Sequence, residues 1–242
     1  MNVVRCDSAA ALGREAAART AVLLREAIAA QGDARLLVST GASQFTLFEA
    51  LVKEDVAWPK VTMFHLDEYV GMPETHPASF VKYLKERFLS AVPMGKAYFV
   101  DGCGDVAANI AALTQRIREK PIDVGLIGIG ENAHIAFNDP PADFETTVAY
   151  QVVRLDEKCR QQQLREGWFA SLEEVPTQAI SISVHEILQC RHILCAVPYA
   201  VKAQAVRDTL RAAEITPLVP ATALRGHADV TLYVDPDSAA LL

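Results

Sequence analysis

The stretch RLLVSTGASQFTLFEALVKEDVAWPKVTMFHL, residues 35–66, decides the fold. It begins with RLLVST (35–40), an apolar run too short for a helix, which predicts a buried strand that ends before Gly41. Apolar residues then recur at helical spacing over 43–54, and VTMFHL (61–66) predicts a second strand. A strand, a helix and a strand in this order predict a parallel pair of strands joined by a crossover helix.

The same alternation extends over the rest of the chain. We expect helices over 8–30, 78–92, near 105–119 and near 200–212, and further strands over 97–100, 123–130, 179–184, 192–197 and 229–235. Strands that alternate with helices predict an α/β fold, in which helices flank both faces of a mostly parallel sheet. No linker, repeat or low-complexity tract interrupts this pattern, so residues 1–242 are expected to form one domain.

The composition excludes several classes of protein. Hydrophobic residues make up 51% and charged residues 22% of the 242 residues, which excludes disordered and fibrous chains. The 23 Lys and Arg against 30 Asp and Glu give a net charge of −7, and without a basic patch no nucleic-acid partner is expected. No apolar run reaches the ~20 residues that span a bilayer, so no membrane partner is expected. The five cysteines include no C-x-x-C pair, which indicates reduced thiols. The N-terminal residues do not resemble a signal peptide, so a cytoplasmic location is expected.

Polar residues gather where the predicted strands end, and ligands bind beyond that edge in open α/β sheets. The Ser/Thr/Gly loop at 39–43 opens a helix, so its amides and hydroxyls suit a phosphate, although a plain helix cap would need the same residue types. Asp67 and Glu68 directly follow the strand at 61–66. Two surface acids are often merely solvated, but a carboxylate at this edge points into the ligand crevice, where partial burial tunes it as a base.

A third polar segment is GIGENAHIAFNDP, residues 128–140. Its G-x-G-x-x-A string is similar to a dinucleotide fingerprint, but two prolines soon after it prevent the long helix that such a motif opens. We interpret the segment as a glycine turn that presents His134 between Asn132 and Asp139, and a histidine oriented by an acid is suited to proton transfer near neutral pH. A structural histidine is the alternative. No pair of histidines has the spacing of metal ligands, so no metal is expected, and no G-x-S-x-G nucleophile motif occurs.

These segments resemble the glucosamine-6-phosphate deaminase (isomerase) family. The matching stretches follow the family's order over most of the chain, and they are residues 38–51, 64–80, 123–140, 176–183 and 197–235. The strings DEYVG and GIGENAHIAFNDP are the specific ones. The resemblance implies a modified Rossmann-like sheet without a nucleotide or other cofactor, a small-molecule sugar phosphate as partner, and a monomer or small homo-oligomer.

The resemblance also implies a reaction, in which glucosamine 6-phosphate and water give fructose 6-phosphate and ammonia by ring opening, enolisation and deamination. Asp67 matches the family's enolisation base and His134 the acid/base of ring opening, while Asn132 and Asp139 match the two residues that support the histidine. The residues that match the phosphate site are Thr40, Gly41, Ala42, Ser43, Lys202 and, in a weaker local alignment, Arg165.

The chain departs from the family pattern at several of these positions. Asp139 stands where many members have Glu, so its shorter side chain is expected to reach His134 through a water or a backbone shift. Asn132 stands where some members have Asp, and Gln44 replaces the usual Pro of the phosphate loop. These changes leave the reaction class intact, and gluco- and galacto-configured amino sugars both fit the pattern.

Two other functions remain open at this stage. A 6-phosphogluconolactonase shares the fold and a related glycine-rich histidine loop, but its motif typically has an arginine after the acid pair, where this chain has Tyr69. A non-catalytic sugar-phosphate-sensing domain is the alternative from a different class, and such proteins carry a helix-turn-helix that does not fit before residue 35. An assay for deamination, lactone hydrolysis or binding alone separates the three.

Overall fold

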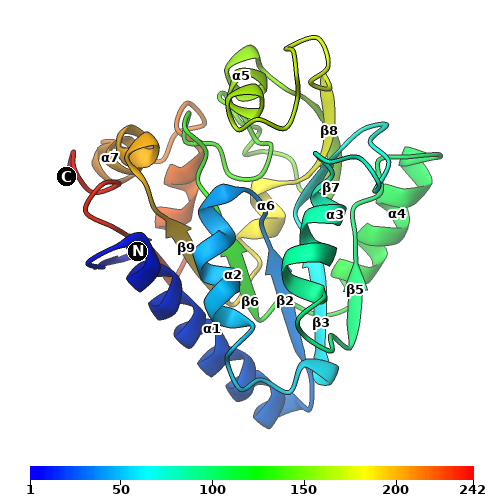
Figure 1. Ribbon diagram of the computed structural model, residues 1–242, viewed down its shortest axis with the longest axis vertical. Coiled ribbons are helices and arrows are strands. Elements are labelled where there is room, and N and C mark those ends of the chain that lie inside the picture. Colours follow the sequence, from blue (N-terminus) through cyan, green and yellow to red (C-terminus); the bar gives the residue numbers. More distant parts are fainter.

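The computed structural model describes residues 1–242, and a seven-stranded sheet runs through its centre (Figure 1). The strands lie in the order β1 (Asn2–Arg5), β10 (Val230–Val234), β9 (His192–Val197), β6 (Val124–Ile127), β2 (Ala34–Val38), β3 (Val61–His65) and β5 (Lys96–Tyr98). Every neighbouring pair is parallel. The predicted α/β fold with a mostly parallel sheet is therefore confirmed.

Helices cover both faces of this sheet. The near face in Figure 1 carries α1 (Ala9–Gln31), α2 (Phe45–Leu51) and α3 (Phe80–Leu84), which a π-helical turn (Lys85–Leu89) extends. The other helices are α4 (Val106–Ile117), α5 (Glu157–Arg165), α6 (Val184–Ile187) and α7 (Ala203–Arg211), and 3-10 turns cover Ala42–Gln44, Trp58–Lys60, Ala200–Lys202 and Pro220–Gly226. None of the helices combines the length and the apolar character that crossing a membrane requires.

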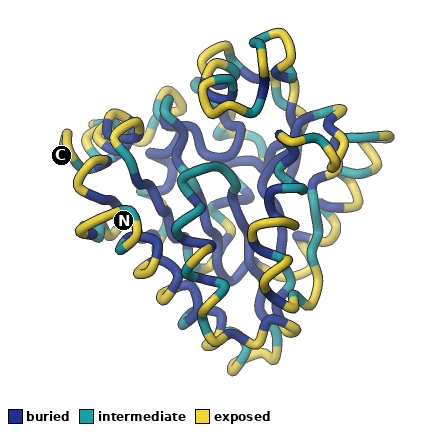
Figure 2. The backbone as a smooth tube through the Cα atoms, in the orientation of Figure 1, coloured by how far each residue is buried: buried dark blue, intermediate teal, exposed yellow.

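The central strands are buried on both faces, which explains their continuous apolar runs. In β2, Leu36 and Val38 pack with α1 and α2, whereas Leu37 faces a second cluster that includes residues of α4, α6 and α7. The side chains of Leu36, Leu37 and Val38 are all inaccessible to solvent. Figure 2 shows the same arrangement as a buried interior inside an exposed outer layer of helices and loops.

A second, antiparallel sheet lies above the carboxyl edge of the first. It consists of β4 (Asp67–Tyr69), β8 (Gln178–Ile182) and β7 (Tyr150–Arg154), in that order. The strand expected over 179–184 belongs to this sheet, so its predicted place in the parallel sheet is wrong. The run is buried almost throughout, and a strand covered on both faces has the same apolar pattern in either kind of sheet.

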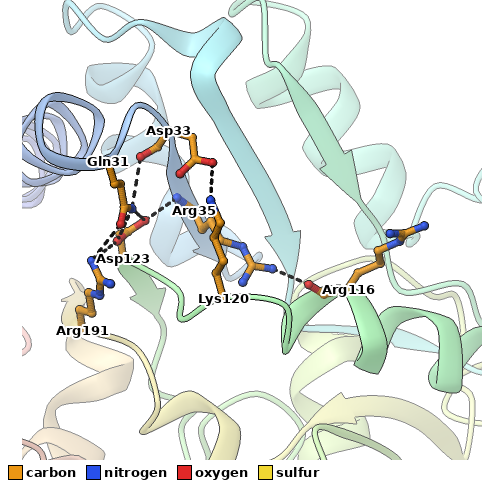
Figure 3. A network of polar contacts seen from close by, with 7 residues as sticks. All are labelled: Gln31, Asp33, Arg35, Arg116, Lys120, Asp123 and Arg191. Atoms are coloured by element: carbon orange, nitrogen blue, oxygen red, sulfur yellow. Dashed lines mark hydrogen bonds and ion pairs between the residues drawn. The ribbon is translucent and has the colours of Figure 1, made fainter.

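A polar network closes the opposite, amino-terminal edge of the parallel sheet (Figure 3). The buried carboxylate of Asp123 accepts hydrogen bonds from the backbone N–H of Arg35 at 2.8 Å, from Gln31 Nε2 at 3.1 Å and from Arg191 Nη1 at 3.0 Å. It thereby links the end of α1 to the starts of β2 and β9. A buried charge with several donors is stable where an unpaired one would be costly, so this edge is a structural one.

Candidate active site

The carboxyl ends of β2, β3, β6 and β9 surround a cleft of about 610 Å³, its open mouth included. Seven of the residues expected to form the site line this cleft, namely Thr40, Gly41, Ala42, Ser43, Asp67, His134 and Lys202. They come from four separate segments of the chain, so the fold brings them together. Asn132 and Asp139 lie behind His134 rather than on the wall of the cleft.

Asp67 is held in the cleft by a strand and not by a loop. It is the first residue of β4, opposite Ser181 of β8, and is 6% exposed. Burial, and secondarily the charge of Glu68, raises the pKa of Asp67 from 3.8 to about 8. A carboxyl group with such a pKa can take and return a proton near neutral pH.

Glu68 points away from Asp67 into the protein and has a structural role. Its carboxylate accepts hydrogen bonds from Ser79 Oγ at 2.8 Å and from the backbone N–H groups of Val81 and Tyr69 at 3.1 and 2.9 Å. Burial raises the pKa of Glu68 to about 7, although these hydrogen bonds oppose the shift. Glu68 therefore anchors the start of α3 beside the cleft and adds to the negative potential at Asp67.

The loop after β6 presents His134 to the cleft. The backbone N–H of His134 donates to Asn132 Oδ1 at 3.2 Å, and Asn132 Nδ2 donates to Asp139 Oδ1 at 3.0 Å. His134 Nδ1 lies 3.0 Å from the same Asp139 oxygen. The shorter aspartate thus lies directly beside the ring, but the contact is not aligned as a hydrogen bond, so the expected water or backbone shift stays a prediction. Burial alone would raise the pKa of Asp139, but His134 and the amides of Asn132 and Asp156 lower it overall, so Asp139 is an anion beside the imidazole.

Lys202 and the loop at 40–43 line the cleft together. The first N–H groups of the 3-10 turn Ala42–Gln44 have no intrahelical acceptor, and Tyr83 Oη steadies the loop by donating to the Gly41 carbonyl at 3.2 Å. Lys202 ends a turn that follows β9 and is buried. Burial lowers the pKa of Lys202, and the charges of Glu166 and Glu131 oppose this shift. A cation and free amides in one place suit an anion.

The α5 helix supplies another wall of the cleft, which no sequence pattern predicts. Gln162, Gln163 and Glu166 line it, and Gln163 Oε1 accepts a hydrogen bond from Tyr69 Oη at 2.7 Å. The segment EKCRQQQLR is too polar to show an apolar helical pattern. The only sequence signal is the Asp156 cap, whose carboxylate accepts from the Cys159 N–H at 2.6 Å.

Arg165, although expected at the phosphate, does not line the cleft. It lies in an adjoining surface hollow and pairs with Glu131, with 2.6 Å between Nη2 and Oε2. To reach the cleft, its guanidinium would have to leave Glu131. The two candidate phosphate cations are thus in different environments, one buried in the cleft and one half-exposed outside it.

Comparison with known proteins decides the family. The pattern of the family described as glucosamine-6-phosphate isomerases/6-phosphogluconolactonase matches residues 7–233. The chain belongs to this family. Within it, the chain is 34% identical over 206 residues to a glucosamine-6-phosphate deaminase of Latilactobacillus sakei, which covers 85% of this chain and 86% of that protein. It is also 34% identical over 221 residues to the Streptococcus uberis deaminase, with 91% and 92% of the two chains covered.

Solved structures of the family agree. A monomeric glucosamine-6-phosphate deaminase superposes with a TM-score of 0.92 at 31% identity, and all of both chains is covered. A 6-phosphogluconolactonase from Shewanella baltica gives a TM-score of 0.80 at 20% identity over 97% of both chains. The second likeness shows the shared fold alone.

Proposed function

We propose that this member of the family is a glucosamine-6-phosphate deaminase, which converts glucosamine 6-phosphate and water to fructose 6-phosphate and ammonia. The proposal rests on one observation: a single cleft holds the buried carboxyl group of Asp67, the imidazole of His134 beside Asp139, and a separate site for an anion. Its relatives above 30% identity that are cited above bear the deaminase name. Its free thiols support a cytoplasmic location.

Two proton transfers follow from the geometry. His134, with its Nδ1 side against Asp139, turns its other ring nitrogen to the cleft and assists ring opening by moving a proton between the ring oxygen and the C1 hydroxyl. Asp67 then takes the proton from C2 of the open-chain sugar and delivers it to C1 through an enolamine. Water attacks the resulting C2 imine, and ammonia leaves.

Substrate binding is separated from these steps. The phosphate is held by the hydroxyls and amides of Thr40, Gly41, Ala42 and Ser43 and by Lys202, which line the cleft. It is attached to C6 of the sugar, away from the reacting carbons C1 and C2. Arg165 contributes only if it leaves its pair with Glu131. No cofactor takes part in this scheme, and the family resemblance implies none.

The position after the acid pair argues against the lactonase alternative. Tyr69 occupies it, is inaccessible to solvent, and packs against Phe80, Phe137 and Phe169 with centroid separations of 5.1 to 5.7 Å. Arginine would place a buried charge among these aromatic rings, which is costly. The side chain typical of the lactonase motif therefore has no place here.

A paired assay tests the proposal. The purified full chain is supplied with glucosamine 6-phosphate, and fructose 6-phosphate and ammonia are both measured; in parallel it is supplied with 6-phosphogluconolactone, and hydrolysis above the spontaneous rate is measured. Equal yields of ketose and ammonia with no lactone hydrolysis support the deaminase. Lactone hydrolysis without ammonia would make it a lactonase, and saturable sugar-phosphate binding without either turnover would make it a sensor.

A further inference from the structure

We propose that His134, Asp139 and Cys159 form a binding site for a thiophilic divalent cation such as Zn²⁺, and that its occupation inhibits the enzyme. The inhibition rests on the function proposed above for His134, whereas the binding does not. Sequence spacing predicts no such site, because Cys159 comes from α5, twenty residues beyond Asp139. The fold alone brings the three side chains together.

The donor atoms have the chemistry and the spacing of a metal site. An imidazole nitrogen, a carboxylate oxygen and a thiol sulfur lie within 4.8 Å of one another, and zinc prefers this mixture of ligands. In tetrahedral zinc sites neighbouring donors are about 3.3 to 3.7 Å apart. The His134 nitrogen and the Asp139 oxygen are already 3.0 Å apart, and the thiol lies within 4.8 Å of both. Small side-chain movements therefore complete the three-ligand arrangement and leave the fourth position to water.

A second observation points to the same place. His134 Nδ1 is buried and, although close to Asp139, is not aligned with it as a hydrogen bond, so this nitrogen has no hydrogen-bonding partner. Buried polar atoms are rarely left in this way. A cation between Nδ1 and the carboxylate would satisfy both groups at once.

The surroundings favour a cation over an anion. Asp156 lies on the same side of the cluster, since its N–H donates to Asp139 Oδ2 at 3.3 Å and its carboxylate accepts from the Cys159 N–H at 2.6 Å. Asn132, which contacts Asp139, also lines the surface hollow beside α5 and so offers a short way in from solvent. A cysteine ligates a metal ion as the thiolate. Binding therefore displaces a thiol proton, and the affinity should rise with pH.

Occupation would stop ring opening. A metal ion on Nδ1 takes the lone pair of the ring nitrogen that faces Asp139, so the other nitrogen keeps its proton and His134 can no longer cycle between its neutral and protonated forms. Asp139 would at the same time give its negative charge to the ion.

Cobalt is the probe for binding. The full chain is stripped with a chelator, desalted and titrated with Co²⁺, and thiolate-to-cobalt charge-transfer absorption is recorded. We expect saturation at one equivalent, loss of the band on adding Zn²⁺, absence of the band in Cys159→Ser, and at least tenfold weaker binding in Asp139→Asn. Cys103→Ser is the matched control, because Cys103 is the most exposed of the five free thiols and lies elsewhere, against the Met72 carbonyl; it should keep the band. A band that survives in Cys159→Ser, or no saturation at all, overturns the site.

Inhibition is measured as the ratio of turnover with and without Zn²⁺ for each variant, so that differences in basal activity cancel. Cys159→Ser should need at least ten times more Zn²⁺ for half inhibition than the wild type or Cys103→Ser. Equal sensitivity of the three would overturn the inhibitory role. If the chain failed to deaminate glucosamine 6-phosphate, the proposed function would fall, and the cobalt spectra would still decide the binding site.

Discussion

The imidazole of His134 lies directly against the α-carbon of Gly130. A β-carbon at Gly130 would be 2.2 Å from Nε2 and 2.3 Å from Cε1 of the ring, a separation that no side chain can adopt. The backbone holds the same pair together, since the Gly130 N–H donates to the His134 carbonyl at 2.9 Å. The second glycine of the GIG string is therefore required by the histidine and not by a nucleotide.

Gly130→Ala should displace the His134 ring from the cleft and lower kcat by about 10²-fold or more, the contribution typical of a positioned acid/base. The fold should persist, because the loop is at the edge of the sheet. Gly128→Ala is the matched control: its β-carbon would meet nothing closer than Gln44 Nε2 at 3.5 Å, an ordinary contact. Steady-state kinetics and thermal unfolding of both variants test this, and a Gly130→Ala enzyme with more than a tenth of wild-type kcat would contradict it.

The raised pKa of Asp67 predicts a pH dependence of activity. The carboxylate is the active form of the base, so kcat/KM should increase with pH until about pH 8. An ordinary aspartate would already be ionised at pH 5, and the activity would then not depend on its titration above that pH. Substrate ionisation also contributes, and Glu68→Gln separates the two effects. It removes a charge that raises the pKa of Asp67, so the profile should move to lower pH while the substrate is unchanged; an unmoved profile would count against Asp67 as the titrating base.

Asp67→Asn should lower kcat by about 10²- to 10⁴-fold while stabilising the fold above neutral pH. The folded-state pKa of about 8 lies above the ordinary value of 3.8, so the folded state binds the extra proton and the wild type loses stability as the pH rises from 3.8 through 8. Asparagine carries no charge and is free of this loss. Unfolding in urea should therefore show equal stability of the two proteins at pH 4 and a more stable variant at pH 9. A variant that is less stable at pH 9 would show that the folded protein favours the ionised carboxylate of Asp67.

The sequence predicts the parallel sheet and most of the cleft because both depend on local patterns. Buried strands such as 35–40 are continuous apolar runs, and ligand residues follow them at a fixed edge. The sequence predicts neither the second sheet nor α5, for physical reasons. Tyr69 belongs to a three-residue strand held by β8, about 110 positions away, and Gln163 enters the cleft from a helix whose exposed polar residues have no apolar period. Contacts of this kind depend on tertiary structure alone.

Lys202→Ala should raise KM by about 10- to 100-fold with little change in kcat, because a charge-assisted contact to the distant phosphate binds substrate and transition state alike. Lys202→Arg should recover part of the loss, since a planar fork does not fit the place of a point charge. Arg165→Ala is the comparison. Because Arg165 is paired with Glu131 outside the cleft, its replacement should change KM much less than Lys202→Ala does. A larger effect at Arg165 than at Lys202 would mean that α5 moves on binding and brings Arg165 to the phosphate.

His65, two residues before the proposed base, is the least satisfied polar side chain of the core. It is inaccessible to solvent, neither ring nitrogen has a hydrogen-bonding partner, and the rings of Phe80 and Phe99 meet it edge-on at 6.4 and 6.3 Å. Burial lowers the pKa of His65 from 6.5 to about 3. Over most of the acid range the side chain is thus neutral in the folded protein, and it takes up a proton only when the protein unfolds.

His65→Leu should therefore leave the protein at least as stable at pH 7.5, because leucine is close to histidine in volume and has no polar atom to leave unpaired. Between pH 6.5 and about 3 the unfolded wild type binds one proton more than the folded state, so its stability falls by up to about 1.4 kcal/mol for each pH unit of acidification. The variant lacks this contribution. The other five of the 6 histidines are present in both proteins, so their contributions cancel in the difference in stability. Urea unfolding at pH 7.5, 6 and 5 should give a difference in favour of leucine that grows towards acid. A constant difference, or a wild type that is the more stable at pH 5, would show that the ring gains a partner or a charge inside the folded protein.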